Sequence, residues 1–192
     1  MRQRLVVMKG MPGSGKSTVS RVLSRRLAWP LVDKDDIKDV LDGAAGDPGG
    51  LAYHAMFNVA RRQLLQGLSV ICDSPLTFPG LYREARQLST ETGALLAVIE
   101  CACPDQDLLR ERIEGRRASP TPSHRVTDWA TYHAYHERIL TTTCYPITDP
   151  YLVLDTTRPL DDVVALALAW MEDFSDVWDG VDESGASLAT SR

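Results

Sequence analysis

Apolar residues along this chain follow two alternating spacings. Short runs of consecutive apolar residues predict buried strands of a parallel sheet, and apolar residues three and four positions apart predict helices. The first run is Leu5–Met8, and helical spacing follows from Val19 to Leu27, before Pro30 marks the exit. Further strands are predicted at residues 31–32, 69–72, 95–99 and 151–154. Further helices are predicted at residues 37–41, 51–66, 79–92, 104–117, 127–140 and 160–172.

This alternation of strand and helix predicts an α/β fold, with a five-stranded parallel sheet covered by helices on both faces. A length of 192 residues is typical of one domain. Beyond Phe174 the chain is acidic, contains Ser and Gly, and lacks periodicity. We therefore expect one domain over residues 1–173 and a flexible acidic tail over residues 174–192.

Charge also separates this tail from the body. The chain carries 21 Lys and Arg against 26 Asp and Glu, and the segment from Glu172 onward accounts for the whole net charge of −5. A neutral body argues against long nucleic acid as a partner, because phosphate binding relies on a basic excess. Leu5–Met8 is too short for the core of a signal peptide, and no apolar run reaches the length of a membrane helix. We expect a cytoplasmic protein without a membrane partner, with its four cysteines as reduced core thiols.

A glycine-rich segment lies between the first predicted strand and the first predicted helix. Gly10–Ser17 matches G-x-x-x-x-G-K-[ST] at every fixed position. The glycines let the backbone fold around phosphate oxygens, the helix N-terminus adds positive potential, and Lys16 neutralises the β- and γ-phosphates. Ser17 is the predicted Mg²⁺ ligand. The segment predicts binding of ATP or GTP with Mg²⁺ through Gly10, Gly13, Ser14, Gly15, Lys16, Ser17 and Thr18.

An acidic turn, Asp33-Lys34-Asp35-Asp36, follows the second predicted strand. A kinase needs a carboxylate that positions the acceptor hydroxyl and takes its proton during phosphoryl transfer. Aspartate is also favoured at the start of a helix, where it caps free backbone N–H groups. The turn by itself leaves both interpretations open.

The segments Met8–Thr18 and Val32–Lys38 resemble the 5′-kinase domain of phage polynucleotide kinase and its small P-loop kinase relatives. Those relatives include the chloramphenicol phosphotransferase, zeta-toxin and gluconate-kinase groups. The resemblance implies a P-loop NTPase fold of the adenylate-kinase-like type with a helical lid. It also implies that Asp35 is the general base and that Lys38 replaces an acceptor-contacting arginine. Since lysine lacks the bidentate fork that arginine offers a phosphate, the replacement weakens the case for a nucleotide 3′-phosphate as acceptor.

The segment Val70–Leu76 resembles the strand end that follows in these kinases. There an aspartate holds Mg²⁺ through water or contacts the acceptor, which implies one of these roles for Asp73. The alternative interpretation is a turn residue at the end of a strand.

A charged helix carries Arg112 and Arg116 four residues apart, with Arg117 just beyond. Like charges at this spacing destabilise an isolated helix by roughly 0.2–0.5 kcal/mol, and an anion between them reverses the sign. The arrangement is similar to the lid arginines of adenylate-kinase-like enzymes. This similarity implies nucleotide-phosphate contacts from Arg112 and Arg116, a lid at about residues 116–128 and stabilisation of the transferring phosphoryl group by Arg116. A solvated helix face is the alternative.

Aromatic residues recur on the next predicted helix, from Trp129 to His136. Packing in the core or at the lid hinge is the favoured interpretation, ahead of stacking against an acceptor ring. His133 and His136 lack the spacing of a zinc helix. After the last strand, Asp155–Arg158 is similar to the loop that borders adenine in these kinases.

Three functions follow from these observations. The first is an ATP-dependent kinase that phosphorylates a hydroxyl of a small metabolite, nucleoside or antibiotic. In this kinase Lys16, Asp35 and Arg116 are catalytic, and Lys38 and Asp73 lie at the acceptor. The second is a polynucleotide 5′-hydroxyl kinase, which needs a basic channel. The third is an ATP-binding regulatory module in which Asp35 only caps a helix.

Overall fold

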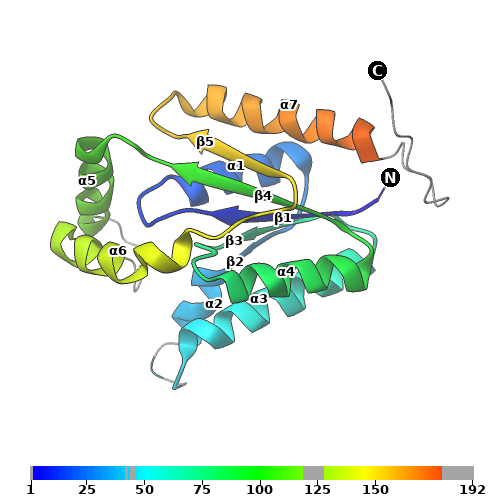
Figure 1. Ribbon diagram of the computed structural model, residues 1–192, viewed down its shortest axis with the longest axis horizontal. Helices are drawn as coiled ribbons and strands as arrows, with labels where there is room; N and C mark the ends of the chain where they lie inside the picture. The colour runs from blue at the N-terminus through cyan, green and yellow to red at the C-terminus, as the bar shows by residue number, and fades with distance from the viewer. Residues whose placement is uncertain (1, 42, 44–45, 119–127, 179–192) are drawn as a thin grey trace.

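A computed structural model describes residues 2–41, 43, 46–118 and 128–178 of the chain, with side chains described for 2–41, 43, 46–116 and 128–173. Five parallel strands form one sheet in the order β2-β3-β1-β4-β5 (Figure 1). They are β1 (Arg4–Lys9), β2 (Leu31–Asp33), β3 (Val70–Asp73), β4 (Leu95–Ala102) and β5 (Tyr151–Asp155). The predicted α/β architecture with a parallel sheet is confirmed.

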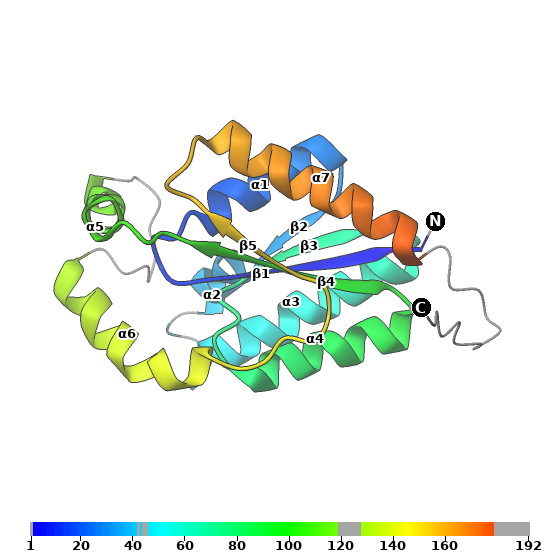
Figure 2. The ribbon, with the colours of Figure 1, turned by 45° about the horizontal axis from the view of Figure 1, so that its top comes forward.

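Helices cover both faces of this sheet (Figure 2). One face packs against α1 (Lys16–Leu27) and α7 (Leu160–Trp178), and the other against α3 (Pro48–Leu65) and α4 (Pro79–Thr92). The central strand β1 explains why the run Leu5–Met8 is continuously apolar. Val6 and Met8 belong to the core under α1 and α7, whereas Leu5 and Val7 belong to the core under α3 and α4. Both sets are buried, so an unpaired polar side chain at any of these four positions would destabilise the fold.

Three further helices lie around the carboxyl ends of the strands. They are α2 (Lys34–Leu41), α5 (Gln106–Glu114) and α6 (Trp129–Thr143), and α5 is followed by a 3₁₀ turn over Gly115–Ala118. In Figure 1, α5 and α6 stand at the left, beyond the arrowhead of β4. Tyr132 packs with Leu109 and Ile113 of α5 in a separate small core, and its ring stacks on Trp129 at 5.0 Å between centroids. The interpretation of these two aromatics as core packing is therefore confirmed, and their role at a lid hinge stays a prediction.

Some predicted boundaries were wrong. Helix α7 continues to Trp178, beyond the expected end at residue 172. Phe174 and Trp178 continue the three- and four-residue spacing from Met171, so the helical pattern in the sequence was ended too early. The expected helix 104–117 is divided between α5 and the 3₁₀ turn. Residues 119–127, which hold most of the expected lid, and residues 179–192 of the expected tail lie outside the described residues.

Two smaller findings concern the cysteines and the membrane. Cys72, Cys101 and Cys103 are buried, as expected of core thiols, but Cys144 is exposed because it directly follows the end of α6 at the surface. Among the described residues, no helix combines the length and apolar character needed to span a membrane.

Candidate active site

The glycine-rich loop between β1 and α1 is confined by backbone and side chains on both sides. Gly10 has a φ of +134°, and a Cβ atom there would lie 2.3 Å from the carbonyl oxygen of Cys101 on β4. Gly13 has a φ of +85°, and its Cβ would lie 2.6 Å from a methyl carbon of Leu109 on α5. Both positions therefore need glycine for conformation and for space. The loop is held in one shape by β4 and α5.

Lys16 opens α1 directly after this loop and folds back over it. Its Nζ donates to the carbonyl oxygen of Met11 at 3.0 Å. Burial lowers the pKa of Lys16, while the nearby Asp73 carboxylate acts in the opposite direction. The ammonium group is thus a buried positive charge beside the loop, suited to an anionic ligand.

Asp73 ends β3 beside the loop and is almost completely buried. Ser20, one turn after Ser17 on α1, donates a hydrogen bond of 2.9 Å to its carboxylate. Sequence reasoning found Asp73 and Ser17 but missed Ser20, whose only signal is its helical spacing from Ser17. Mg²⁺ prefers hard oxygen ligands and usually takes one or two carboxylates together with substrate phosphates. The hydroxyl of Ser17 and the carboxylate of Asp73 line one cavity, so this donor set fits the expected ion.

The acidic turn joins β2 to α2. Its contacts distinguish a carboxylate that caps the helix from one that is available as a general base. Asp33 accepts a hydrogen bond of 2.9 Å from the backbone N–H of Asp35, so the capping contact belongs to the Asp33 side chain. The Asp35 carboxylate instead lies 2.5 Å from Nζ of Lys34. Burial, reinforced by the carboxylate of Asp73, raises the pKa of Asp33 to about 6. Lys34 is itself buried, with its Nζ 5.6 Å from the centre of the Tyr53 ring.

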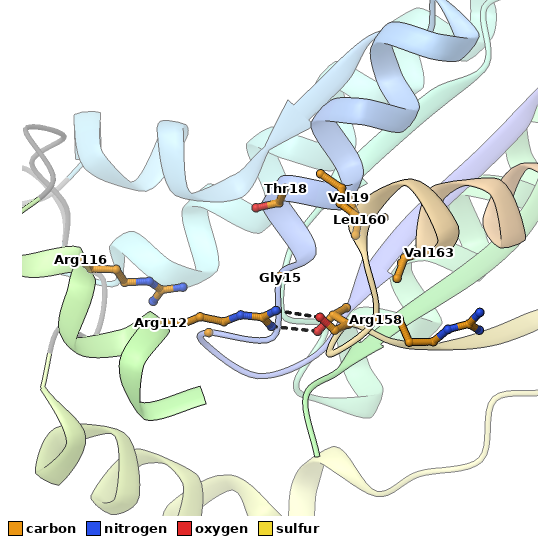
Figure 3. Close-up of a pocket in the computed structure, with 10 residues that line it drawn as sticks. Gly15, Thr18, Val19, Arg112, Arg116, Arg158, Leu160 and Val163 are labelled. Carbon is orange, nitrogen blue, oxygen red and sulfur yellow. Dashed lines mark hydrogen bonds between the residues drawn. The ribbon is translucent and has the colours of Figure 1, made fainter. Parts of the chain in front are cut away.

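A cavity of about 410 Å³, called cavity A here, lies on one side of the loop (Figure 3). Arg112 of α5 reaches across it and donates to the hydroxyl and carbonyl oxygens of Thr156, at 3.1 and 2.7 Å. The hydroxyl of Thr156 in turn donates to the carbonyl oxygen of Ser14 at 2.9 Å. These bonds tie α5 and the segment after β5 to the loop. Cavity A is lined by Gly13, Gly15, Thr18, Val19, Arg112, Arg116, Thr156, Arg158, Leu160 and Val163.

A second cavity of about 430 Å³, cavity B, lies on the other side and shares Gly13, Gly15, Thr18 and Arg116 with cavity A. Predicted residues from four parts of the chain meet there. Its remaining walls are formed by Pro12, Lys16, Ser17, Arg21, Asp33, Lys34, Asp35, Lys38, Asp73, Ser74, Pro75, Tyr135 and Arg138.

Most of the predicted site residues therefore line one of these two cavities. Gly10 and Ser14 line neither: Gly10 packs against β4, and the buried hydroxyl of Ser14 has no hydrogen-bond partner among the described residues. Arg112 was expected to bind phosphate, and two of its N–H donors are taken by Thr156. The side chain of Arg117 lies outside those described. Sequence reasoning assigned no role to Lys34 and Ser74, although both lie in segments that it singled out, and it missed Arg21 and Arg138, which carry no local motif.

Solved structures share this fold. A protein from Chloroflexus aurantiacus has a TM-score of 0.70 at 24% identity, covering 88% of this chain and 98% of that one. A gluconokinase from Sinorhizobium meliloti has a TM-score of 0.65 at 19% identity, covering 92% and 97%. An APS kinase from Mycobacterium tuberculosis, in complex with AMPPNP and APS, has a TM-score of 0.64 at 21% identity, covering 89% and 98%. The fold is that of P-loop kinases.

Curated sequences and a family also match this chain. An uncharacterized protein of Mycobacterium tuberculosis is 27% identical over 154 residues, which cover 68% of this chain and 31% of that protein. The chain thus spans about a third of this relative's length. A shikimate kinase from Corynebacterium glutamicum is 38% identical over 60 residues, covering 31% of this chain and 34% of that enzyme. Residues 5–138 match a family described as AAA domain. With this match over more than half its length and a P-loop kinase fold, the chain belongs to the AAA domain family.

Proposed function

We propose that this protein is an ATP-dependent phosphotransferase that moves the γ-phosphoryl group of ATP to a hydroxyl of a small molecule. The observation that carries the proposal is cavity B. Its walls combine Lys16 and Ser17 of the phosphate loop with a carboxylate, Asp35, on a separate element. A protein that only binds ATP does not require a carboxylate on the wall opposite the phosphate loop. The names of the similar proteins, among them gluconokinase and shikimate kinase, agree with this chemistry.

In this proposal the nucleotide binds along the loop, with its phosphates against Gly13, Gly15 and Lys16 and its base toward Thr156 in cavity A. Ser17 and Asp73 hold Mg²⁺, which neutralises charge on the β- and γ-phosphate oxygens. Arg116 borders both cavities, so its guanidinium stabilises negative charge on the phosphoryl group during transfer.

Asp35 then orients the acceptor hydroxyl and accepts its proton. The acceptor oxygen forms a bond to the γ-phosphorus as the bond from that phosphorus to the bridging oxygen of ADP breaks, and the proton goes to the carboxylate. The ammonium group of Lys34, 2.5 Å away, stabilises the charged carboxylate that this role requires. Lys34 is thus a positioning residue for the base.

The test is ADP release with Mg-ATP across sugars, hydroxy acids, nucleosides, aminoglycosides, phenicols and a 5′-hydroxyl oligonucleotide. We expect acceptor-dependent release that falls at least ~10²-fold in Asp35→Ala, the lower range for general-base catalysis. Asp36→Ala is the matched control, because Asp36 is the exposed neighbour on the same helix. Release that ignores every acceptor and every substitution would instead support the regulatory module, and release stimulated only by the oligonucleotide would support the polynucleotide kinase.

A further inference from the structure

The walls of cavity B carry an excess of positive charge. Three carboxylates line it, those of Asp33, Asp35 and Asp73. Six cationic side chains line it as well: Lys16, Arg21, Lys34, Lys38, Arg116 and Arg138. A cavity of this composition attracts anions and disfavours cations.

Four of the six cations are accounted for by neighbours or by the nucleotide. Arg21 lies 4.0 Å from the carboxylate of Asp33, and Lys34 pairs with Asp35. Lys16 and Arg116 border the phosphate loop and serve the phosphates of ATP in the proposed function. Lys38 and Arg138 remain.

Lys38 and Arg138 come from two different elements. Lys38 lies three residues after Asp35 on α2, a spacing that places both side chains on one face of that helix. Arg138 belongs to α6, and its guanidinium carbon lies 5.6 Å from the centre of the Tyr135 ring. Among the described side chains, no carboxylate forms an ion pair with either residue. A guanidinium held against an aromatic ring keeps N–H donors for an anion.

From this arrangement we infer that the acceptor carries a negatively charged group, a carboxylate or a phosphate, bound by Lys38 and Arg138 while its hydroxyl meets Asp35. The inference rests on the proposed function and narrows it. Neutral sugars, unmodified nucleosides and cationic aminoglycosides lack the charge that these two residues recognise. Lys38 and Arg138 therefore determine acceptor specificity and do not take part in the bond-making step.

The first experiment tests for the anion site with a probe that does not depend on the identity of the acceptor. Sulfate is titrated by calorimetry, at constant ionic strength, into protein saturated with Mg²⁺ and AMPPNP, so that the phosphate loop is occupied. We expect saturable binding that weakens about tenfold in Lys38→Ala and in Arg138→Ala. Arg62→Ala removes an exposed charge from α3, outside both cavities, and should bind sulfate like the native protein. Absent sulfate binding, or equal binding by all variants, overturns the inference.

The second experiment compares acceptors that share a polyol backbone but differ in charge, the neutral member having a hydroxyl where the other has its anionic group: gluconate with sorbitol, and glycerate and glycerol 3-phosphate with glycerol. We expect ADP release only with the anionic members, and a KM for that acceptor about tenfold higher in Lys38→Ala with kcat nearly unchanged. Lys38→Arg should restore the KM. The carboxylate and phosphate arms identify which anion is preferred.

The two proposals fail in different ways. A neutral or cationic acceptor that works as well as any anionic one overturns the anion site and leaves the kinase intact. Protein that binds no AMPPNP, or that binds sulfate but transfers phosphate to no acceptor, contradicts the proposed function instead.

Discussion

The two opposite walls of cavity B differ in whether backbone or side chains face the ligand. The wall formed by the phosphate loop is mostly backbone, held by glycines whose missing Cβ atoms allow close approach to β4 and α5. The opposite wall of cavity B is made of side chains from α2, from the end of β3 and from α6. A backbone wall recognises what all nucleoside triphosphates share, whereas a side-chain wall can change with a few substitutions. Specificity is therefore expected in the second wall.

The largest effect is expected on substitution of Lys16, the charged side chain of the phosphate-loop wall. Lys16→Met should lower kcat by about 10²–10³-fold, because its ammonium group lies at the phosphate loop, where it stabilises charge on the transferred γ-phosphoryl group. The thermal stability of this variant should not fall, because burial of the Lys16 ammonium group, which lowers the pKa of Lys16, disfavours folding in the native protein. Steady-state kinetics and thermal unfolding check both parts. Arg26→Met, on the exposed face of α1, is the control, and equal kinetic loss in that variant would contradict the role of Lys16.

The backbone wall itself is tested by Gly10→Ala. The added methyl would meet the Cys101 carbonyl in a conformation with positive φ, so we expect the free energy of unfolding to fall by about 2–3 kcal/mol. Urea denaturation measures it. Gly115→Ala has open space and a φ of −60°, and should change stability by less than about 1 kcal/mol. If both variants unfolded alike, the loop would not be confined as described.

In the side-chain wall, the buried carboxyl group of Asp33 is expected to lower the stability of the folded protein at neutral pH. Its pKa in the folded protein, about 6, exceeds the ordinary value of 3.8. The folded state therefore disfavours the ionised carboxyl, and stability is lost as the pH rises from about 4 through 6. Asp33→Asn keeps a carbonyl acceptor for the Asp35 N–H and should be more stable than the native protein by about 1–2 kcal/mol at pH 8. Urea unfolding without Mg²⁺ or nucleotide should show this gain vanish below pH 4, and a gain independent of pH would contradict the cause.

The smallest expected effect concerns the contact that ties α5 and the segment after β5 to the phosphate loop. Arg112→Lys removes the bidentate contact with Thr156 that helps to hold the phosphate loop in place, so we expect AMPPNP to bind about three- to tenfold more weakly. Equilibrium titration measures this. Arg110→Lys, on the exposed face of the same helix, should bind as the native protein does.

The contrast between the walls also explains what the sequence could predict. Gly10–Ser17 is a contiguous motif with a fixed geometry, so one segment was enough to predict the loop and its lysine. Strands β1, β3 and β4 were visible as continuous apolar runs because both faces of the sheet are buried there. Lys38 and Arg138, in contrast, are 100 positions apart in the sequence, and Arg112 meets Thr156 across 44 positions. Such pairs depend on how α2, α5 and α6 pack around the sheet edge, and no local pattern encodes it.

Arg116 borders cavity A and cavity B at once, as do Gly13, Gly15 and Thr18. A ligand in either cavity therefore alters the electrostatic field in the other. Thermodynamic linkage then requires reciprocity: whatever factor the nucleotide applies to the affinity of the acceptor, the acceptor applies to the affinity of the nucleotide. With one guanidinium shared between the sites, the substrates are expected to bind as a coupled pair, and the acceptor's charge becomes part of how tightly the nucleotide is held.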